Sequence, residues 1–133
     1  MPRTTLLDTD YATLWYYPEE KIVRHEFHRF IHGTPFREVL EKGLEVFIQN
    51  GAGKWLSDDR KNSSLTSEDL AWSAQDWSRR CMAAGWKYWA IIMPDKIAGQ
   101  LNMNRILKDY IEQSLVVRVF EDPEEALAWL KSV

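Results

Sequence analysis

Short strand-like runs of hydrophobic residues recur along the whole chain. Apolar, aromatic and β-branched residues concentrate in five such segments: 11–17, 21–31, 54–57, 86–94 and 115–120. The first two flank Pro-Glu-Glu-Lys, which supplies a turn, so we expect them to form a hairpin. The segment 86–94 is apolar on both of its faces, which is typical of a central strand in a covered parallel sheet.

Four helices are predicted from hydrophobic residues that recur at helical spacing. Thr34 as a cap and Pro35 in the first turn begin the first helix, and Gly51 or Gly53 can take the left-handed turn that ends it. The third helix follows the loop Pro-Asp-Lys-Ile-Ala-Gly-Gln. The last one begins after Asp122, which has the features of a cap residue followed by proline and two glutamates.

The second helix has the most informative start. Thr66 is the expected cap residue, and Asp69 falls at the third helical position in a variant of the capping box. The helix then buries one stripe of residues and ends at Gly85. We expect this buried stripe to consist of Leu70, Ala74, Trp77 and Cys81.

The resulting order is ββαβαβαβα, which defines an α/β fold. A hairpin followed by alternating strands and helices predicts a mostly parallel sheet with right-handed crossovers and one antiparallel strand at its N-terminal edge. Repeats and low-complexity linkers are absent from the sequence. We therefore expect residues 1–133 to form a single domain.

Composition and charge remove several classes of function. The 133 residues are 45% hydrophobic and 28% charged, with a formal net charge of -3 and no concentrated stripe of Lys and Arg. We therefore expect no nucleic-acid binding, because that needs a basic surface to neutralise phosphates.

The sequence has no signal peptide and no apolar run long enough to span a membrane, so we expect a cytoplasmic protein. The one cysteine, Cys81, excludes an intrachain disulfide and is expected to be a buried thiol.

Three segments carry a resemblance to a known family: KWLSDDR at 54–60, GWKYWAIIMP at 85–94 and VFEDPEEALAWLKSV at 119–133. Together with the element order they resemble the STAS-like family, whose SpoIIAA-like fold occurs in anti-sigma-factor antagonists and in domains attached to sulfate transporters. The resemblance covers the chain from Tyr11 to Val133 and is nearest to small, free-standing bacterial members. It implies a regulatory module that is not an enzyme and that binds another protein. The partner is either a regulatory protein or a second copy of this chain, because the edge strand of the hairpin can pair and an aromatic surface can seal a dimer.

The resemblance also implies a phosphorylation switch. In the antagonists, a partner kinase phosphorylates a serine at the start of the helix that follows the third strand, and this controls docking. In this chain the equivalent candidates are Ser63, Ser64, Thr66 and Ser67. A phosphate there would meet free N–H groups and the positive end of the helix dipole. The chain departs from the antagonists in having a longer charged loop where they have a compact turn.

The loop from Asp58 to Ser67 and the loop from Pro94 to Gln100 are expected to frame a shallow binding rim. Both follow the carboxyl ends of parallel strands, where ligands bind in open α/β sheets. Asp58 and Asp59 belong either to a solvated loop held by ion pairs with Arg60, or to a site for a cation or for phosphoryl transfer. Trp72 is either an exposed hot spot for a protein partner or packed against a neighbouring helix. The candidate rim residues are Asp58, Asp59, Arg60, Trp72, Asp95 and Lys96.

Other chemistry finds little support in the sequence. His25 and His28 point to opposite faces of a strand and His32 lies beyond it, so no metal site is expected. A phosphate loop, a Ser-His-Asp order and an activated cysteine are all absent, so we expect neither catalysis nor a cofactor. The alternative function is a carrier of a small apolar or lipid-like ligand. Sec14-type lipid-carrying proteins share the architecture, and seven Trp residues suit an aromatic-lined cavity.

Overall fold

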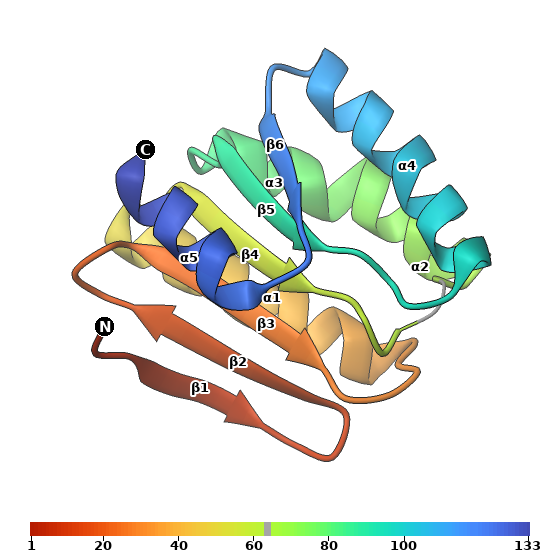
Figure 1. The fold of residues 1–133 in the computed structure, drawn as a ribbon, viewed down its shortest axis with the longest axis horizontal. Coiled ribbons are helices and arrows are strands. Elements are labelled where there is room, and N and C mark those ends of the chain that lie inside the picture. Colours follow the sequence, from red (N-terminus) through yellow and green to blue (C-terminus); the bar gives the residue numbers. More distant parts are fainter. Residues whose placement is uncertain (63–64) are drawn as a thin grey trace.

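The structure, a computed structural model, describes residues 1–62 and 65–133 (Figure 1). In chain order its elements are β1 (Thr4–Asp8), β2 (Ala12–Tyr17), β3 (Ile22–Phe27), α1 (Thr34–Asn50), β4 (Lys54–Asp58), α2 (Ser67–Trp72), the π-helical segment η1 (Ser73–Trp77), α3 (Ser78–Ala83), β5 (Tyr88–Ile92), α4 (Ile97–Glu112), β6 (Val116–Phe120) and α5 (Pro123–Ser132).

The strands form one mixed sheet in the order β1-β2-β3-β4-β5-β6. β1, β2 and β3 pair antiparallel, and β3 to β6 pair parallel. The predicted α/β fold, with a largely parallel sheet and antiparallel pairing at its N-terminal edge, is confirmed. The structure adds β1, which the sequence pattern did not indicate. A register shift between Thr5 and Leu7 interrupts the alternation of this short, largely exposed strand.

The added strand changes which edges of the sheet are open. β2 was expected to be the edge strand of the hairpin, and therefore a place where a second copy could pair. In the structure β1 occupies that edge of β2 along residues 13–16. The two edge strands of the sheet are therefore β1 and β6. On this side of the sheet, the open edge at which a second copy could pair is therefore β1 and not β2.

Helices cover both faces of the sheet (Figure 1). α1, α3 and α4 pack over a large core that includes Phe47, Trp55 and Met103. α5 packs on the opposite face against β4, β5 and β6, where Leu127 and Leu130 belong to a smaller core. The face that carries α1 and α4 holds most of the aromatic side chains and, as described below, the candidate site.

The ends of α1 agree only in part with the predicted caps. Gly33, with a φ of 65°, is the residue that precedes the helix, and Thr34 is already helical, so the prediction of Thr34 as the cap is wrong. Gly33 donates its N–H to the carboxylate of Asp69 at 2.8 Å. This bond to a distant residue takes the place of a side-chain cap within the helix. At the other end Gly51 has a φ of 63°, which confirms one of the two predicted left-handed positions.

The second predicted helix contains a π-helical turn. Thr66 caps it by accepting the N–H of Asp69, as predicted. The wide turn of η1 contains one additional residue, which rotates the preceding turn by about 100° relative to an unbroken α-helix. As a result Ser73 and Ser78 are buried, whereas Leu70 and Ala74 are exposed. The predicted buried stripe is therefore wrong for these last two residues and right for Trp77 and Cys81.

Gly43 permits a close approach between α1 and β4. The aromatic ring of Trp55 lies directly over it, and a Cβ atom at Gly43 would be 2.1 Å from the nearest ring carbon. Trp55 itself is 1% exposed and is enclosed by Phe47 and Trp77. The ring therefore has little freedom to move away from an added methyl group.

Gly43→Ala is expected to lower the free energy of unfolding by about 1–3 kcal/mol, because the extra carbon overpacks a filled core. In an unhindered helix interior the same change would instead stabilise by up to about 1 kcal/mol, so the sign of the change tests the contact. Urea unfolding followed by circular dichroism measures it. Lys42→Ala, on the exposed neighbouring position, is the control and should stay within about 0.5 kcal/mol of the wild type. A Gly43→Ala variant as stable as the wild type would contradict this packing.

Candidate functional site at the carboxyl edge of the parallel strands

The loops after β4 and β5 meet at the carboxyl edge of the sheet. Asp59 donates its N–H to the carbonyl of Ile92 at 3.1 Å, and Asp95 donates to the carbonyl of Arg60 at the same distance. The two segments from which the rim was predicted therefore lie side by side. Their side chains divide between the two faces of the sheet, because successive residues of an extended chain point in opposite directions.

Asp58 lies on the α5 face and is held by Arg60. The guanidinium of Arg60 donates from Nε at 2.9 Å and from Nη2 at 2.7 Å to the two carboxylate oxygens of Asp58, which is 1% exposed. The hydrogen bond to Asp58 raises the pKa of Arg60. The predicted ion pair with Arg60 is confirmed, but the prediction of a solvated loop is wrong for both aspartates. Asp59 is 7% exposed because it points to the opposite face, beneath α1 and α4.

Asp59 ends a buried chain of hydrogen bonds with His25 and Trp55. The indole Nε1 of Trp55 donates to Nδ1 of His25 at 3.0 Å, and Nε2 of His25 lies 2.8 Å from Oδ1 of Asp59. Indole N–H is only a donor, so Nδ1 must be the accepting nitrogen of a neutral ring and Nε2 must carry the proton. His25 therefore donates to Asp59, and both of its ring nitrogens are used.

Of the predicted phospho-acceptors, the structure describes Thr66 and Ser67, and Ser63 and Ser64 lie outside the described residues. Thr66 is half-buried and its hydroxyl oxygen accepts the N–H of Asp69 at 3.2 Å. Ser67 is exposed at the first position of α2.

The carboxylate of Asp69 bonds to residues near the start of α1 and not to the cap residue Thr66 of its own helix. It accepts from Gly33 and, at 3.3 Å, from Nε of Arg37, so it links α2 to the start of α1. This differs from the capping box that the sequence suggested, in which the side chain at this position bonds back to the cap residue.

The remaining rim residues differ in their exposure. Asp95 and Lys96 are exposed directly before α4. Trp72 is half-buried, with its ring edge-on to Phe36 at 6.4 Å and the guanidinium of Arg37 stacked 5.1 Å from its centroid. Of the two interpretations of Trp72, the structure favours packing against the neighbouring helix α1.

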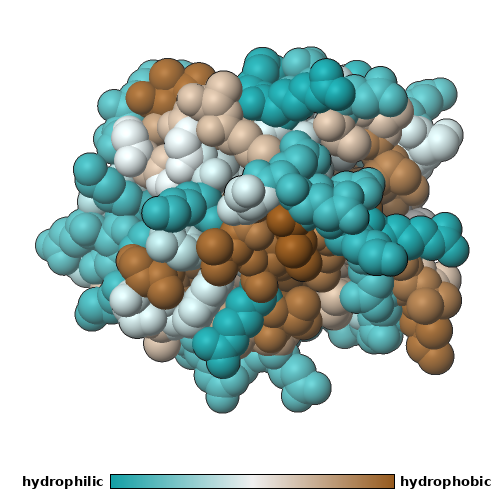
Figure 2. All heavy atoms as spheres, turned by 90° about the horizontal axis from the view of Figure 1, so that it is seen from above, coloured by the Kyte–Doolittle hydropathy of each residue, from teal (hydrophilic) through white to brown (hydrophobic). Residues whose placement is uncertain are grey.

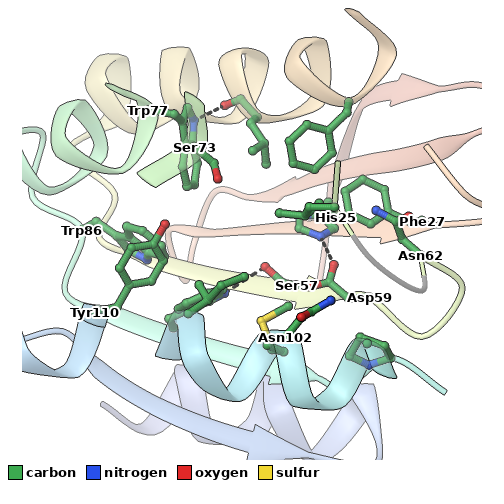
Figure 3. Close-up of a pocket in the computed structure, with 18 residues that line it drawn as sticks. His25, Phe27, Ser57, Asp59, Asn62, Ser73, Trp77, Trp86, Asn102 and Tyr110 are labelled. Carbon is green, nitrogen blue, oxygen red and sulfur yellow. Dashed lines mark hydrogen bonds and ion pairs between the residues drawn. The ribbon is translucent and has the colours of Figure 1, made fainter. Parts of the chain in front are cut away.

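A cavity of about 80 Å³ lies beneath this rim, between the sheet and α1, η1 and α4 (Figure 3). His25 and Asp59 form part of its wall, together with Ser57 and Asn62 from the strand ends and Asn102 from α4. The remaining wall is largely hydrophobic and includes six aromatic residues. The aromatic lining residues are Phe27, Phe36, Trp77, Trp86, Trp89 and Tyr110.

Most of the polar groups around the cavity have structural partners. Trp89 donates its indole N–H to Ser57 Oγ at 2.9 Å, and Trp77 donates to the carbonyl of Leu40 at 2.8 Å. Burial raises the pKa of Tyr110, while hydrogen bonding to Ser78 and Ser73 lowers it. Ser57 and Tyr110 were not among the site residues predicted from the sequence. The available signal for Ser57 was a small polar residue directly after the apolar pair Trp55-Leu56.

Exposed hydrophobic side chains lie on the outer side of the same edge. Leu70, Ile97 and Leu101 are 38%, 73% and 56% exposed. Leu70 and Asn102 line one shallow groove between the α2–η1 segment and α4. Figure 2 shows another side of the molecule, seen from above the end of α4 and the start of β6, where hydrophobic side chains gather near the centre of a largely hydrophilic surface.

Neither a metal site nor an activated cysteine was expected from the sequence. Within residues 1–62 and 65–133, no three side chains of His, Cys, Asp and Glu come together as a metal site would need. Burial strongly raises the pKa of the Cys81 thiol, which is fully enclosed, so the expected buried thiol is confirmed. None of the described helices is both long enough and apolar enough to cross a bilayer.

Comparison with known proteins identifies the fold. No protein-family model matches the chain, and no curated protein matches its sequence. A solved structure from Thermotoga maritima, described as a "putative anti-sigma factor antagonist", superimposes with a TM-score of 0.55 at 12% sequence identity, covering 84% of this chain and 88% of that chain. The chain therefore has the SpoIIAA-like fold that the sequence predicted.

His25 is expected to be in the Nε2–H tautomer, which the chemical shifts of its ring nitrogens in NMR spectra report directly. Trp55→Phe removes the donor to Nδ1 and should lower the free energy of unfolding by about 1–3 kcal/mol, because a buried acceptor loses its partner. Trp72→Phe makes the same chemical change at a half-buried ring and should cost less. An Nδ1–H tautomer in the wild type, or equal costs for the two variants, would refute the hydrogen-bond chain.

Proposed function

We propose that the protein is a non-catalytic regulatory module that acts by binding another protein through the outer side of this edge. We define the docking surface as Leu70, Ile97 and Leu101 with the flanking charges Asp95 and Lys96. The observation that carries the proposal is the exposure of three large aliphatic side chains on two adjacent helices. Exposed apolar groups rimmed by polar residues are typical of protein-interaction surfaces.

The origin of the docking surface supports a functional interpretation. Leu70 would be buried in an unbroken helix, and the π-helical turn of η1 brings it to the surface. Ile97 and Leu101 are four residues apart and share one face of α4. Likeness in fold to an anti-sigma factor antagonist is consistent with a regulatory role, although at 12% identity it concerns the fold.

Two other functions find less support in the described residues. For catalysis by Asp58 or Asp59, one carboxylate would have to be free to react, but Asp58 is clamped by Arg60 and Asp59 accepts from His25. For a lipid carrier, the cavity is small. Its volume of about 80 Å³ is roughly half that of an engineered cavity that accepts benzene, so an acyl chain does not fit.

The docking surface predicts that Ile97→Ser combined with Leu101→Ser weakens partner capture at least about tenfold, because truncating central apolar contacts typically costs more than 1 kcal/mol each. The measurement is quantitative mass spectrometry of proteins retained by immobilised wild type and variant from lysate of the native host. Ile48→Ser is the matched control, because Ile48 is 64% exposed on α1, outside the docking surface.

The proposal requires a protein that wild type and Ile48→Ser retain equally and that the double variant loses. Binding of the recovered partner is then repeated with purified components. If all three proteins retain the same set, the docking surface is wrong. If the double variant loses a second copy of this chain, the partner is the protein itself.

We further propose that phosphorylation of Ser67 regulates docking at this surface. Ser67 lies at the first position of α2, three residues before Leu70, and is exposed to a kinase. Thr66 is the weaker candidate among the described residues, because its hydroxyl oxygen is engaged as the helix cap. A phosphate on Ser67 would meet the N-terminal end of α2 but would also face the acidic Glu68 and Asp69, so the expected effect is on partner binding.

Protein isolated from its native host is expected to include a form heavier by one phosphate, and fragmentation should place that phosphate on Ser67. Ser67→Ala should remove this form and leave stability within about 0.5 kcal/mol of the wild type. Thr66→Ala should instead lower the free energy of unfolding by about 1 kcal/mol, through loss of the cap. A phosphate on Ser63 or Ser64 would overturn the assignment to Ser67. Unmodified protein under all growth conditions would remove the switch.

A further inference from the structure

The two edges of the sheet differ in how well they are protected against pairing with another strand. On β1 a register shift between Thr5 and Leu7 interrupts the strand, and bulges of this kind are a common protection of sheet edges. β6 pairs with β5 in unbroken register along all five of its residues. Its sequence contains neither proline nor glycine, and Arg118 is its one charged residue. β6 is therefore the edge that is suited to accept a further strand.

The outward-facing backbone groups of β6 belong to Val117 and Val119. Val116 donates its N–H to the carbonyl of Lys87 at 2.9 Å, so its backbone faces β5. The backbone groups of successive strand residues alternate between the two sides, so those of Val117 and Val119 face away from β5. In the described part of the chain, no backbone hydrogen bond to a loop or helix engages these groups.

The side chains of β6 make this edge largely apolar. Val116 and Val119 are 44% and 45% exposed. The guanidinium of Arg118 stacks on Phe120, 5.0 Å from the centroid of its ring. Natural edge strands usually carry charges, proline or bulges that discourage pairing. A regular edge strand with exposed β-branched residues therefore favours pairing with another strand.

We propose that β6 pairs antiparallel with β6 of a second copy of this chain, about a two-fold axis at Val119, so that the two sheets become continuous. A two-fold axis normal to the sheet brings the same strand of both copies together in antiparallel orientation. The pairing uses none of the residues of the docking surface, so the inference goes beyond the proposed function.

Open backbone groups and charge together select the position of the axis. An axis at Val117 would need the N–H of Leu115 for pairing, but that group already donates to the carbonyl of Tyr110 at 3.2 Å. An axis at Arg118 would place two guanidinium groups directly opposite each other, and like charges in that position destabilise a strand pair.

An axis at Val119 meets neither obstacle. Arg118 then lies opposite Phe120 of the second copy, and Val117 lies opposite Glu121. The backbone remains extended as far as Asp122, which has a φ of -116° and a ψ of 123°. The N–H of Glu121 has no backbone partner among the described residues. Every backbone group that this register needs is therefore open.

Sedimentation equilibrium of the purified wild type, from micromolar to millimolar concentration, is expected to show a reversible dimer. Val119→Lys should weaken the dimer at least about tenfold, because it places two ammonium groups at the axis. Val119→Glu should weaken it similarly. An equimolar mixture of the two variants should associate again, because unlike charges then face each other across the axis.

Val116→Lys is the matched control. It makes the same change at an equally exposed position of the same strand, but in this register it lies opposite Asp122 of the second copy and should retain the dimer. Urea unfolding at low concentration verifies that each variant is folded. If a Val119 variant does not fold, amide hydrogen exchange of the wild type still decides, because higher concentration should slow exchange at Val117 and Val119 and leave β1 unchanged.

Four results would overturn the proposal: a wild type that stays monomeric, a Val119→Lys dimer as tight as that of the wild type, an equal loss in Val116→Lys, and a mixture that does not associate. A monomeric wild type that retains a host protein which Val119→Lys loses would assign the edge to an extended segment of another protein.

The proposed function fails independently of this dimer. A dimer lost in the double variant Ile97→Ser and Leu101→Ser but kept in Val119→Lys would place self-association on the docking surface and overturn pairing through β6. Capture of a different protein by the docking surface should be unaffected by Val119→Lys, so the two failures are distinguishable.

Discussion

The indole N–H of Trp55 is buried and must find an acceptor inside the protein, because an unpaired buried donor costs about 1–3 kcal/mol. The ring is confined by Gly43 on α1, so its N–H is directed toward β3, where Nδ1 of His25 accepts it at 3.0 Å. That bond leaves the proton of His25 on Nε2 and orients it toward Asp59. The contact between Trp55 and Gly43 thus orients His25, which in turn holds Asp59 just after the end of β4. The same hydrogen bonds leave His25 uncharged in the wall of the cavity.

The same requirement explains the other polar groups in this aromatic core. Ser57 accepts from Trp89, and a backbone carbonyl of α1 accepts from Trp77. The cavity lies among these rings, because Trp77, Trp86 and Trp89 contact one another in series and all belong to its lining. Asp59 is the one acidic side chain among the described lining residues, and it receives its hydrogen bond from His25 and not from an indole.

Periodicity sufficed for the parallel part of the sheet and for the helices that connect it, because segment 86–94 is strongly apolar and most of the helices have clear start and stop signals. It failed for β1, where a bulge breaks the alternation, and for the π-helical turn, which has no recognised sequence signature. Adjacent aspartates looked solvated because charge usually lies at the surface. Asp58 is held by its near neighbour Arg60, but the buried partner of Asp59 is His25, 34 residues earlier in the chain.

The π-helical turn relates the two halves of the candidate site. An additional residue within η1 turns Ser73 toward the cavity and, by the same rotation, turns Leu70 toward solvent. Converting the segment to a regular α-helix would therefore alter both surfaces together, burying Leu70 and withdrawing Ser73 from the cavity wall. π-helical turns are rare and occur frequently at functional sites. The cavity and the docking surface thus differ in chemistry, but both include a residue of the continuous α2–η1 segment. Any movement of α2 relative to α4 would therefore change both.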